Sequence, residues 1–146
     1  MRLWHQTLIP YLPNKQLLGQ HRECCALRGK GWGRKHSIVD YVFRYPIELL
    51  VAYHQVVMDE MLFHDWNIDW SWKSAKYRGK NILKDESINP GLALSIQIES
   101  RQGFMIYQEH DKEYLIECLD NLKSKGIFLD RKEVLTNYEK HAKHMI

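Results

Sequence analysis

PIELLVAYHQVVMDEMLFH, residues 46–64, is the stretch that decides the fold. Apolar side chains recur along it at spacings of three and four residues, which is the pattern of an amphipathic helix. Pro46 suits the first helical position, because its φ is already helical and an N–H there would have no partner. We predict a helix over 46–64, with His54 on its apolar face more readily a core histidine than a functional one. The apolar positions are Ile47, Leu50, Val51, Val57, Met58, Met61 and Leu62.

Capping residues mark three further helices. Asn14 can cap a helix over about 15–27, and Asp111 can cap another whose apolar residues begin at Leu115. Asp130 and the glutamate three residues later form a capping-box-like start for a last helix. We therefore expect roughly four helices in all.

The remaining segments are expected to be irregular. Residues 1–13 contain two prolines, 29–36 contain three glycines, and 65–90 are polar, basic and rich in tryptophan. The alternating segment 92–98 is compatible with a short strand or an irregular helix. With no internal repeat and no linker, the chain reads as an all-α, compact, single-domain helical bundle over 1–146. It has long basic loops and room for one short strand pair.

The composition indicates a globular protein of a reducing compartment. The 146 residues are 45% hydrophobic and 27% charged, and no apolar run reaches the roughly 18–20 residues of a membrane helix. The N-terminus lacks the features of a signal peptide, and three cysteines do not form a disulfide framework. We expect a cytoplasmic monomer. His21 lies three residues before Cys24, but no second ligand pair follows at zinc-finger spacing, so we expect no metal and no cofactor.

The net charge of +3 is distributed unevenly. The stretch from Cys24 to Val39 has no acidic residue, and neither has the stretch from Lys73 to Lys84. Such segregation suits a polyanionic partner, although two solvated basic loops would give the same pattern. The basic residues concerned are Arg28, Lys30, Arg34, Lys35, Lys73, Lys76, Arg78, Lys80 and Lys84.

LLGQHRECC, residues 17–25, contains a glycine inside a predicted helix. Gly19 and Glu23 are one turn apart and share a face, and a helical glycine costs about 1 kcal/mol relative to alanine. Either another helix crowds Gly19 while Glu23 is idle, or Gly19 leaves space for a reaction at Glu23. Arg22, about 100° round the helix from Glu23, could meet a phosphate at the same time.

Five sequence blocks resemble the pyrimidine dimer DNA glycosylase (phage endonuclease V-like) family. Their order and spacing match that family over roughly residues 1–84. The final 60 or so residues are more similar to uncharacterised bacterial relatives. The blocks are MRLW (1–4), LLGQHRE (17–23), GRKH (33–36), AYHQVVMDEM (52–61) and YRGK (77–80).

The resemblance implies a catalytic mechanism. In this family the α-amine of the first residue is the nucleophile and the glutamate of an Arg-Glu pair is the catalytic acid. Carried over, the glutamate is Glu23, with Arg22 beside it. Met1 should be retained because Arg2 is too large for its removal, so Met1 supplies the amine and Arg2 matches the phosphate-contacting arginine. The chain departs from the phage enzyme by this one extra residue and by the lack of a threonine hydroxyl.

The resemblance implies double-stranded DNA containing a damaged base as the partner, and the activity of a DNA glycosylase and AP lyase. We expect association with the bacterial nucleoid when the protein is bound to DNA. Trp32 is either a wedge in the duplex or a seal of its own loop onto the core. The alternatives are a DNA-binding protein without chemistry, a glycosylase/lyase for a different damaged or modified base, and a metal-dependent nuclease that uses histidines. The predicted DNA contacts are Arg2, Arg22, Arg28, Trp32, Arg34, Lys35, His36, Arg78 and Lys80.

Overall fold

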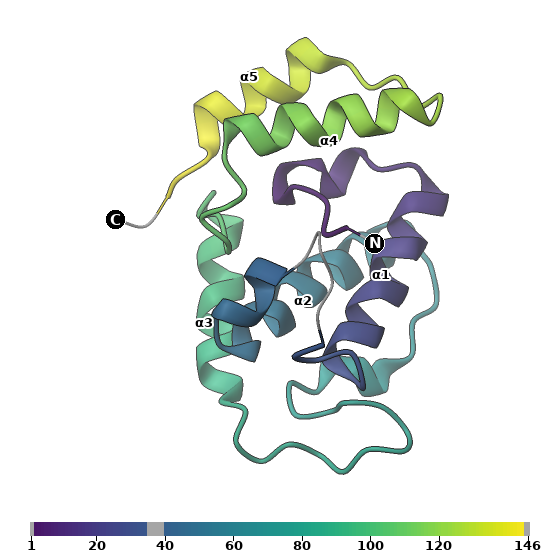
Figure 1. Cartoon of the computed structure of the whole chain (residues 1–146), viewed down its shortest axis with the longest axis vertical. Coiled ribbons are helices and arrows are strands. Elements are labelled where there is room, and N and C mark those ends of the chain that lie inside the picture. Colours follow the sequence, from purple (N-terminus) through teal and green to yellow (C-terminus); the bar gives the residue numbers. More distant parts are fainter. Residues whose placement is uncertain (1, 35–39, 145–146) are drawn as a thin grey trace.

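Helix α2 (Ile47–Phe63) is the centre of the computed structural model, which describes residues 2–34 and 40–144. Helices α1 (Asn14–Arg28) and α3 (Pro90–Arg101) both pack against it (Figure 1). The predicted helix over 46–64 is therefore confirmed to within one residue at each end, and His54 on it is fully buried. The described residues form no strand, so the all-α prediction is confirmed.

The segment before α1 is more ordered than expected. A 3₁₀ helix, η1 (Gln6–Tyr11), occupies part of the stretch predicted to be irregular. The prediction that Asn14 caps α1 is wrong, because Pro13 is the N-cap residue and Asn14 is the first helical residue. Pro13 has an extended ψ of 158°, so the helix begins directly after it.

Helix α3 replaces the short strand or irregular helix expected at 92–98. The Asn89 side chain accepts a hydrogen bond from the Leu92 N–H at 3.1 Å, and Pro90 follows at the first helical position. This Asn-Pro pair is a helix-start signal that the alternating apolar pattern concealed. Glu48 of α2 accepts a hydrogen bond from the Asn89 N–H at 2.7 Å and so fixes the start of α3. The isolated bridge between Phe104 and Lys143 is the nearest feature to the expected strand pair among the described residues.

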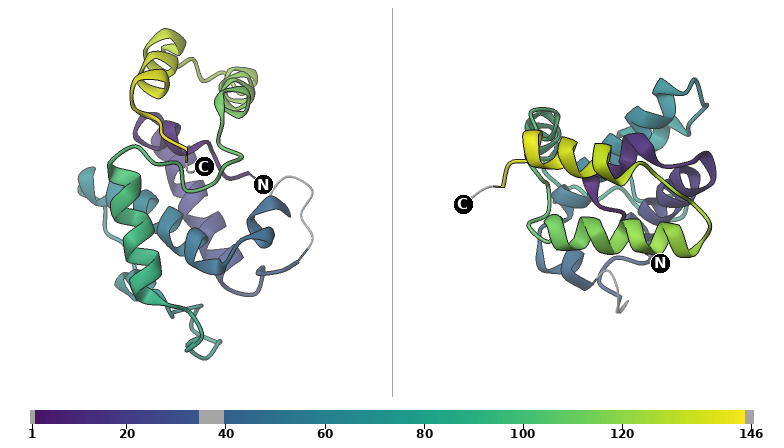
Figure 2. Two further views of the ribbon diagram at one scale, coloured as in Figure 1. Left: turned by 90° about the vertical axis from the view of Figure 1, so that its left-hand side faces the viewer. Right: turned by 90° about the horizontal axis from the view of Figure 1, so that it is seen from above.

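Helices α4 (Lys112–Ser124) and α5 (Arg131–His141) form a hairpin beside the N-terminal segment (Figures 1 and 2). Their predicted caps are confirmed: Asp111 accepts from the Tyr114 N–H at 2.9 Å, and Asp130 accepts from the Glu133 N–H at 3.1 Å. The hairpin and the long loop 65–89, which contains the 3₁₀ helix η3 (Trp70–Lys73), lie at opposite ends of the molecule (Figure 1).

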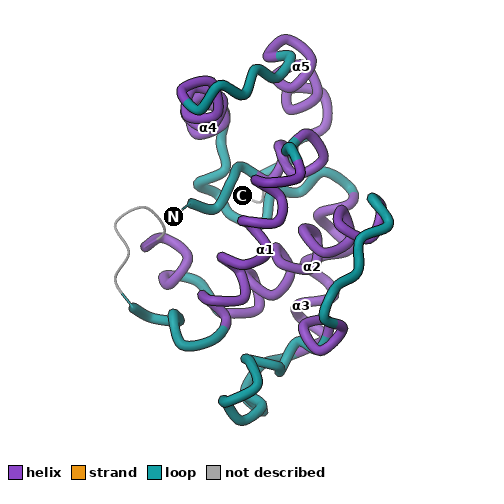
Figure 3. Tube along the Cα trace, turned by 90° about the vertical axis from the view of Figure 1, so that its right-hand side faces the viewer, coloured by secondary structure: helices purple, strands orange, loops and turns teal. Residues whose placement is uncertain are grey.

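The N-terminal segment lies between this hairpin and the α1–α2 pair (Figure 3). Buried Gln6 anchors it, because its side chain donates to the Phe104 carbonyl at 3.0 Å and accepts from the Ile106 N–H at 2.8 Å. Its backbone N–H donates to the ring of His110 at 3.0 Å. A further 3₁₀ helix, η2 (Asp40–Arg44), packs on α2.

Within the described ranges, none of the helices is long and apolar enough to cross a lipid bilayer.

Three buried histidines predict loss of stability in acid. Burial lowers the pKa of His5 to about 4 and the pKa values of His54 and His110 well below their usual range. The unfolded chain binds protons near pH 6.5 and the folded chain does not, so stability is full above that pH and falls as the pH drops towards 4. The loss is about 1.4 kcal/mol per pH unit for each histidine. Urea unfolding between pH 7.5 and pH 4.5 measures it.

His54→Gln should reduce this pH dependence by about one proton, since glutamine can still accept from Arg28 but does not titrate. The same exchange at exposed His141 is the matched control. A free energy of unfolding that does not change between pH 7 and pH 5 would contradict the prediction.

Candidate active site

Residues 2–4 are fixed beside the middle of α1. The Gln20 amide group donates to the Arg2 carbonyl at 3.0 Å, and its oxygen accepts from the Trp4 N–H at 2.6 Å. Tyr53 of α2 donates to the Trp4 carbonyl at 2.6 Å. Gln20 lies about one helical turn before Glu23, the predicted catalytic residue, on the same helix. Sequence reasoning missed Gln20, although it shares the stretch that drew attention to Glu23.

The surface in front of α1 is open at Gly19. Gly19 and Arg22 are exposed and Glu23 is partly buried. A Cβ atom added at Gly19 would have no described atom within 4 Å, so crowding by another described helix does not explain this glycine. Space for a ligand stays a prediction. Met1 lies outside the described residues, and the approach of its amine to Glu23 therefore also stays a prediction.

Arg2 lies against α4. Its guanidinium carbon is 5.8 Å from the ring centroids of both Trp4 and Tyr114, and its Nη1 is 3.7 Å from Glu117 Oε1. Only 15% of its side chain is exposed, whereas Glu117 is 64% exposed. A DNA phosphate would have to replace Glu117 as the partner of Arg2, and the predicted phosphate contact is untested.

The prediction that Arg28 contacts DNA is wrong, because this side chain is fully buried. Its guanidinium donates to the carbonyls of Trp72 and Ser74, both at 2.9 Å, and more weakly to two others in the same loop. Burial lowers its pKa to about 10, which leaves it charged at neutral pH. Arg28 therefore holds the loop 72–77 to the end of α1.

Arg78 forms a second link between the same loop region and the C-terminal end of α1. It donates to the carbonyls of Arg28 and Gly29 at 2.8 and 3.0 Å, which lie at the C-terminus of α1, where carbonyls lack a partner within the helix. Arg78 is therefore a helix-capping residue, and its contact with phosphate stays a prediction. The chain then turns at Gly31, whose N–H donates to the Ala26 carbonyl at 2.9 Å, and an added Cβ would lie 2.8 Å from that oxygen.

A cavity of about 520 Å³ lies where these two basic segments meet. Four cations line it, and no carboxylate is among its described lining residues. Arg34 and Lys80 are exposed there, as predicted DNA contacts would need to be. A cavity of about 600 Å³ elsewhere is lined by Asp59 and Glu60, which suits phosphate poorly. The cations are Lys30, Arg34, Arg78 and Lys80.

The structure favours one of the two interpretations of Trp32. Its ring packs edge-on against Phe43, with centroids 5.2 Å apart and an interplanar angle of 89°, and it is partly buried. This contact is the expected one for a side chain that seals its loop onto the core. Lys35 and His36, which follow in the same loop, lie outside the described residues.

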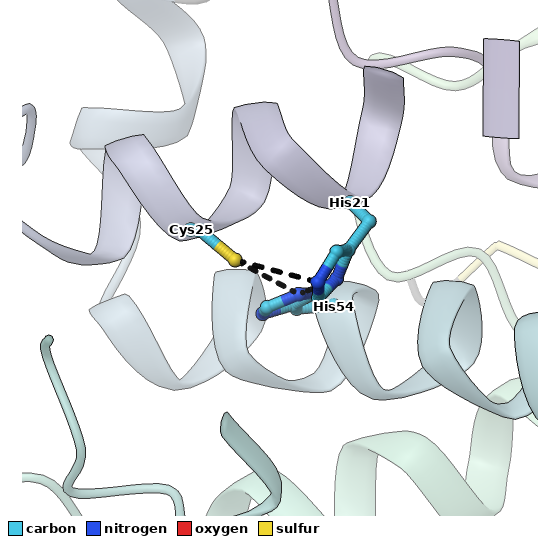
Figure 4. Close-up of side chains that lie close together, drawn as sticks. All are labelled: His21, Cys25 and His54. Carbon is cyan, nitrogen blue, oxygen red and sulfur yellow. Dashed lines mark hydrogen bonds between the residues drawn. The ribbon is translucent and has the colours of Figure 1, made fainter. Parts of the chain in front are cut away.

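Among the described residues, one group of side chains has ligand atoms close enough together to hold a metal ion (Figure 4). The group consists of His21, Cys25 and His54. His21 Nδ1 is 2.8 Å from His54 Nε2, and Cys25 Sγ is 3.7 Å from His21 Nε2. The sequence had paired His21 with Cys24, but Cys24 is fully buried and Cys25 is the neighbour of the two rings.

The hydrogen bonds of this cluster oppose metal binding. A guanidinium can only donate, so the 2.9 Å contact with Arg28 makes His54 Nδ1 an acceptor. The neutral ring then carries its proton on Nε2 and donates to His21 Nδ1, whose own Nε2–H faces Cys25. A metal ion at His54 Nε2 would need an imidazolate beside a buried cation. We assign these side chains to packing between α1 and α2.

One equivalent of Zn²⁺ should therefore leave the melting temperature of the protein unchanged. A tight zinc site would raise it by several degrees through its binding free energy. Differential scanning calorimetry with zinc and with EDTA measures the difference. A rise that His21→Gln abolishes would show that the cluster binds the metal.

Arg28→Met should destabilise the protein by about 3 kcal/mol or more, because the carbonyls of the loop 72–77 and the buried ring of His54 lose a charged donor. Arg22→Met, the same exchange at an exposed position of α1, is the matched control and should change stability by less than about 0.5 kcal/mol. Urea unfolding at pH 7 compares them. Equal effects of the two exchanges would refute the structural role of Arg28.

A family model provides independent evidence about the first half of the chain. The model described as pyrimidine dimer DNA glycosylase matches residues 1–74, which include the chain start, Gln20, Glu23 and the whole of α2. No curated protein and no solved structure matches the chain. The family match spans half of the 146 residues. The chain belongs to the pyrimidine dimer DNA glycosylase family.

Proposed function

We propose that this protein is a DNA repair glycosylase with AP lyase activity, in which the Met1 α-amine is the nucleophile and Glu23 moves protons. One observation supports this most strongly. In a chain of this family, Gln20 binds the backbone of Arg2 and Trp4 one helical turn from Glu23. The first amine of the chain follows directly from that fixed segment.

The chemistry requires only an amine and a carboxyl group. The neutral amine attacks C1′ of the damaged nucleotide, and the C1′–N bond to the base breaks as the base takes up a proton. Opening of the sugar ring gives a Schiff base between C1′ and the amine. Removal of a C2′ proton then breaks the 3′ C–O bond, and the phosphate leaves. An α-amine has an ordinary pKa of about 7.7–8.0, so a sizeable fraction is neutral at physiological pH.

Glu23 is suited to the proton transfers. A carboxyl group beside the reacting sugar can protonate the ring oxygen, stabilise the cationic intermediate and accept the C2′ proton. Glu23 is partly buried, and the open surface at Gly19 is on the same face of α1. This arrangement would let a sugar approach the carboxylate without meeting another helix.

DNA would bind across the basic end of α1. Arg22, Arg34 and Lys80 are exposed and are our proposed phosphate contacts. Duplex DNA hides C1′, so the enzyme would kink the helix or extrude a nucleotide. The proposed substrate is a pyrimidine dimer in double-stranded DNA. Another damaged or modified base is the alternative.

Borohydride reduction tests the proposal. The untagged protein, incubated with UV-irradiated or abasic duplex DNA, should form a covalent adduct that survives EDTA. Mass spectrometry should locate the adduct at the Met1 amine, and an N-terminal tag should abolish it. DNA binding without an adduct would favour a DNA-binding protein without chemistry, and cleavage lost in EDTA would favour a metal-dependent nuclease.

Glu23→Gln should lower turnover by about 10²- to 10⁴-fold, because the proton-transferring group is lost. Its affinity for DNA should be retained. Glu113→Gln, the same exchange at an exposed position of α4, is the control for the change in net charge. Full activity of Glu23→Gln, or loss of folding, would contradict a catalytic role.

A further inference from the structure

The α4–α5 hairpin lies wholly beyond the residues matched by the family model, yet α4 contacts the start of the chain. We propose that Tyr114 of α4 is a positioning residue, which fixes residues 2–4 and so restricts the chain that carries the terminal amine. This inference rests on the proposed function, and it assigns part of the active site to the C-terminal half of the protein.

Tyr114 binds the N-terminal segment directly. Its hydroxyl donates to the Leu3 carbonyl at 2.5 Å, across 111 residues of sequence. Burial raises the pKa of this phenol, so it keeps the proton that it donates. The ring also lies under the Arg2 guanidinium, with the guanidinium carbon 5.8 Å from the ring centroid. The Tyr114 side chain thus contacts both the backbone of Leu3 and the side chain of Arg2.

Three helices together fix this short segment. The carbonyls of Arg2, Leu3 and Trp4 each accept a hydrogen bond from a different helix. The donors are Gln20 of α1 at 3.0 Å, Tyr114 of α4 at 2.5 Å and Tyr53 of α2 at 2.6 Å. Contacts from three different helices restrict the translation and the rotation of this segment.

Such restriction matters for an amine at a chain end. Chain termini are ordinarily mobile, and a nucleophile reacts faster when it is held near its target. Gln20 and Tyr53 lie within the family match, and the donor to Leu3 comes from outside it. The hairpin therefore completes the set of contacts that the first half of the chain begins.

The test compares two tyrosines that join the N-terminal segment to the hairpin. Tyr114→Phe removes the bond to Leu3 and keeps the ring against Arg2. Tyr11→Phe removes the hydroxyl that accepts from Asn137 Nδ2 at 3.0 Å, away from residues 2–4. Under single-turnover conditions with abasic duplex DNA, Tyr114→Phe should form the trapped adduct about 10-fold more slowly, with unchanged affinity for DNA. Tyr11→Phe should stay within about twofold of the unmodified protein.

Hydrogen exchange of the Trp4 amide provides a readout without DNA. In Tyr114→Phe this amide should exchange about 10-fold faster, because the segment opens locally more often. Tyr11→Phe should leave it unchanged.

The outcomes separate the two proposals. Adduct formation by Tyr114→Phe at the unmodified rate, or equal losses in both variants, overturns the positioning role and leaves the proposed function standing. Failure of the unmodified protein to form an adduct overturns the proposed function. In that case, faster exchange of the Trp4 amide in Tyr114→Phe would show that the contact with Leu3 still fixes residues 2–4. Unchanged exchange would overturn this structural role of Tyr114 as well.

Discussion

The two hydrogen bonds between Gln20 and the backbone of Arg2 and Trp4 are the constraint on which the proposed site depends. A side-chain amide has both a donor and an acceptor, so one buried residue can bind a carbonyl and an N–H of the same extended segment. An exposed chain end would fray without such contacts. Because Gln20 belongs to the same helix as Glu23, the segment and the carboxylate share one rigid support.

The far end of α1 is fixed by an equally specific arrangement. Arg28 donates to carbonyls of the loop 72–77. Arg78, which follows that loop, donates to the carbonyls of Arg28 and Gly29. Two arginines that the charge pattern assigned to DNA therefore bind the protein itself. Their positive charge stays at the end of α1, close to the exposed Arg34 and Lys80. Helix α1 thus joins the chain start at its middle to a basic cavity at its end.

The sequence predicted local features well and long-range pairing poorly. The apolar spacing of α2 and the caps at Asp111 and Asp130 were readable because each depends on neighbours in the chain. The Asn89-Pro90 start of α3 was readable as well, but the alternation of 92–98 obscured it. The burial of Arg28 could not be read, since the carbonyls that it binds lie more than 40 residues away. The contact between Tyr114 and Leu3 joins opposite halves of the chain and leaves no local pattern.

The exposed face of α1 suggests how its middle and its C-terminal end would serve one substrate. Gly19, Arg22 and Ala26 are exposed at spacings of three and four residues, and they form a stripe that leads to the cavity lined by Ala26 and Lys30. From Glu23 to the end of α1 the axis advances about 8 Å, which is roughly two base-pair steps of a duplex. A strand that ran along α1 with its damaged nucleotide at Glu23 would therefore place phosphates over the basic cavity. The two small residues that flank Arg22 would let the backbone of that strand approach the helix closely.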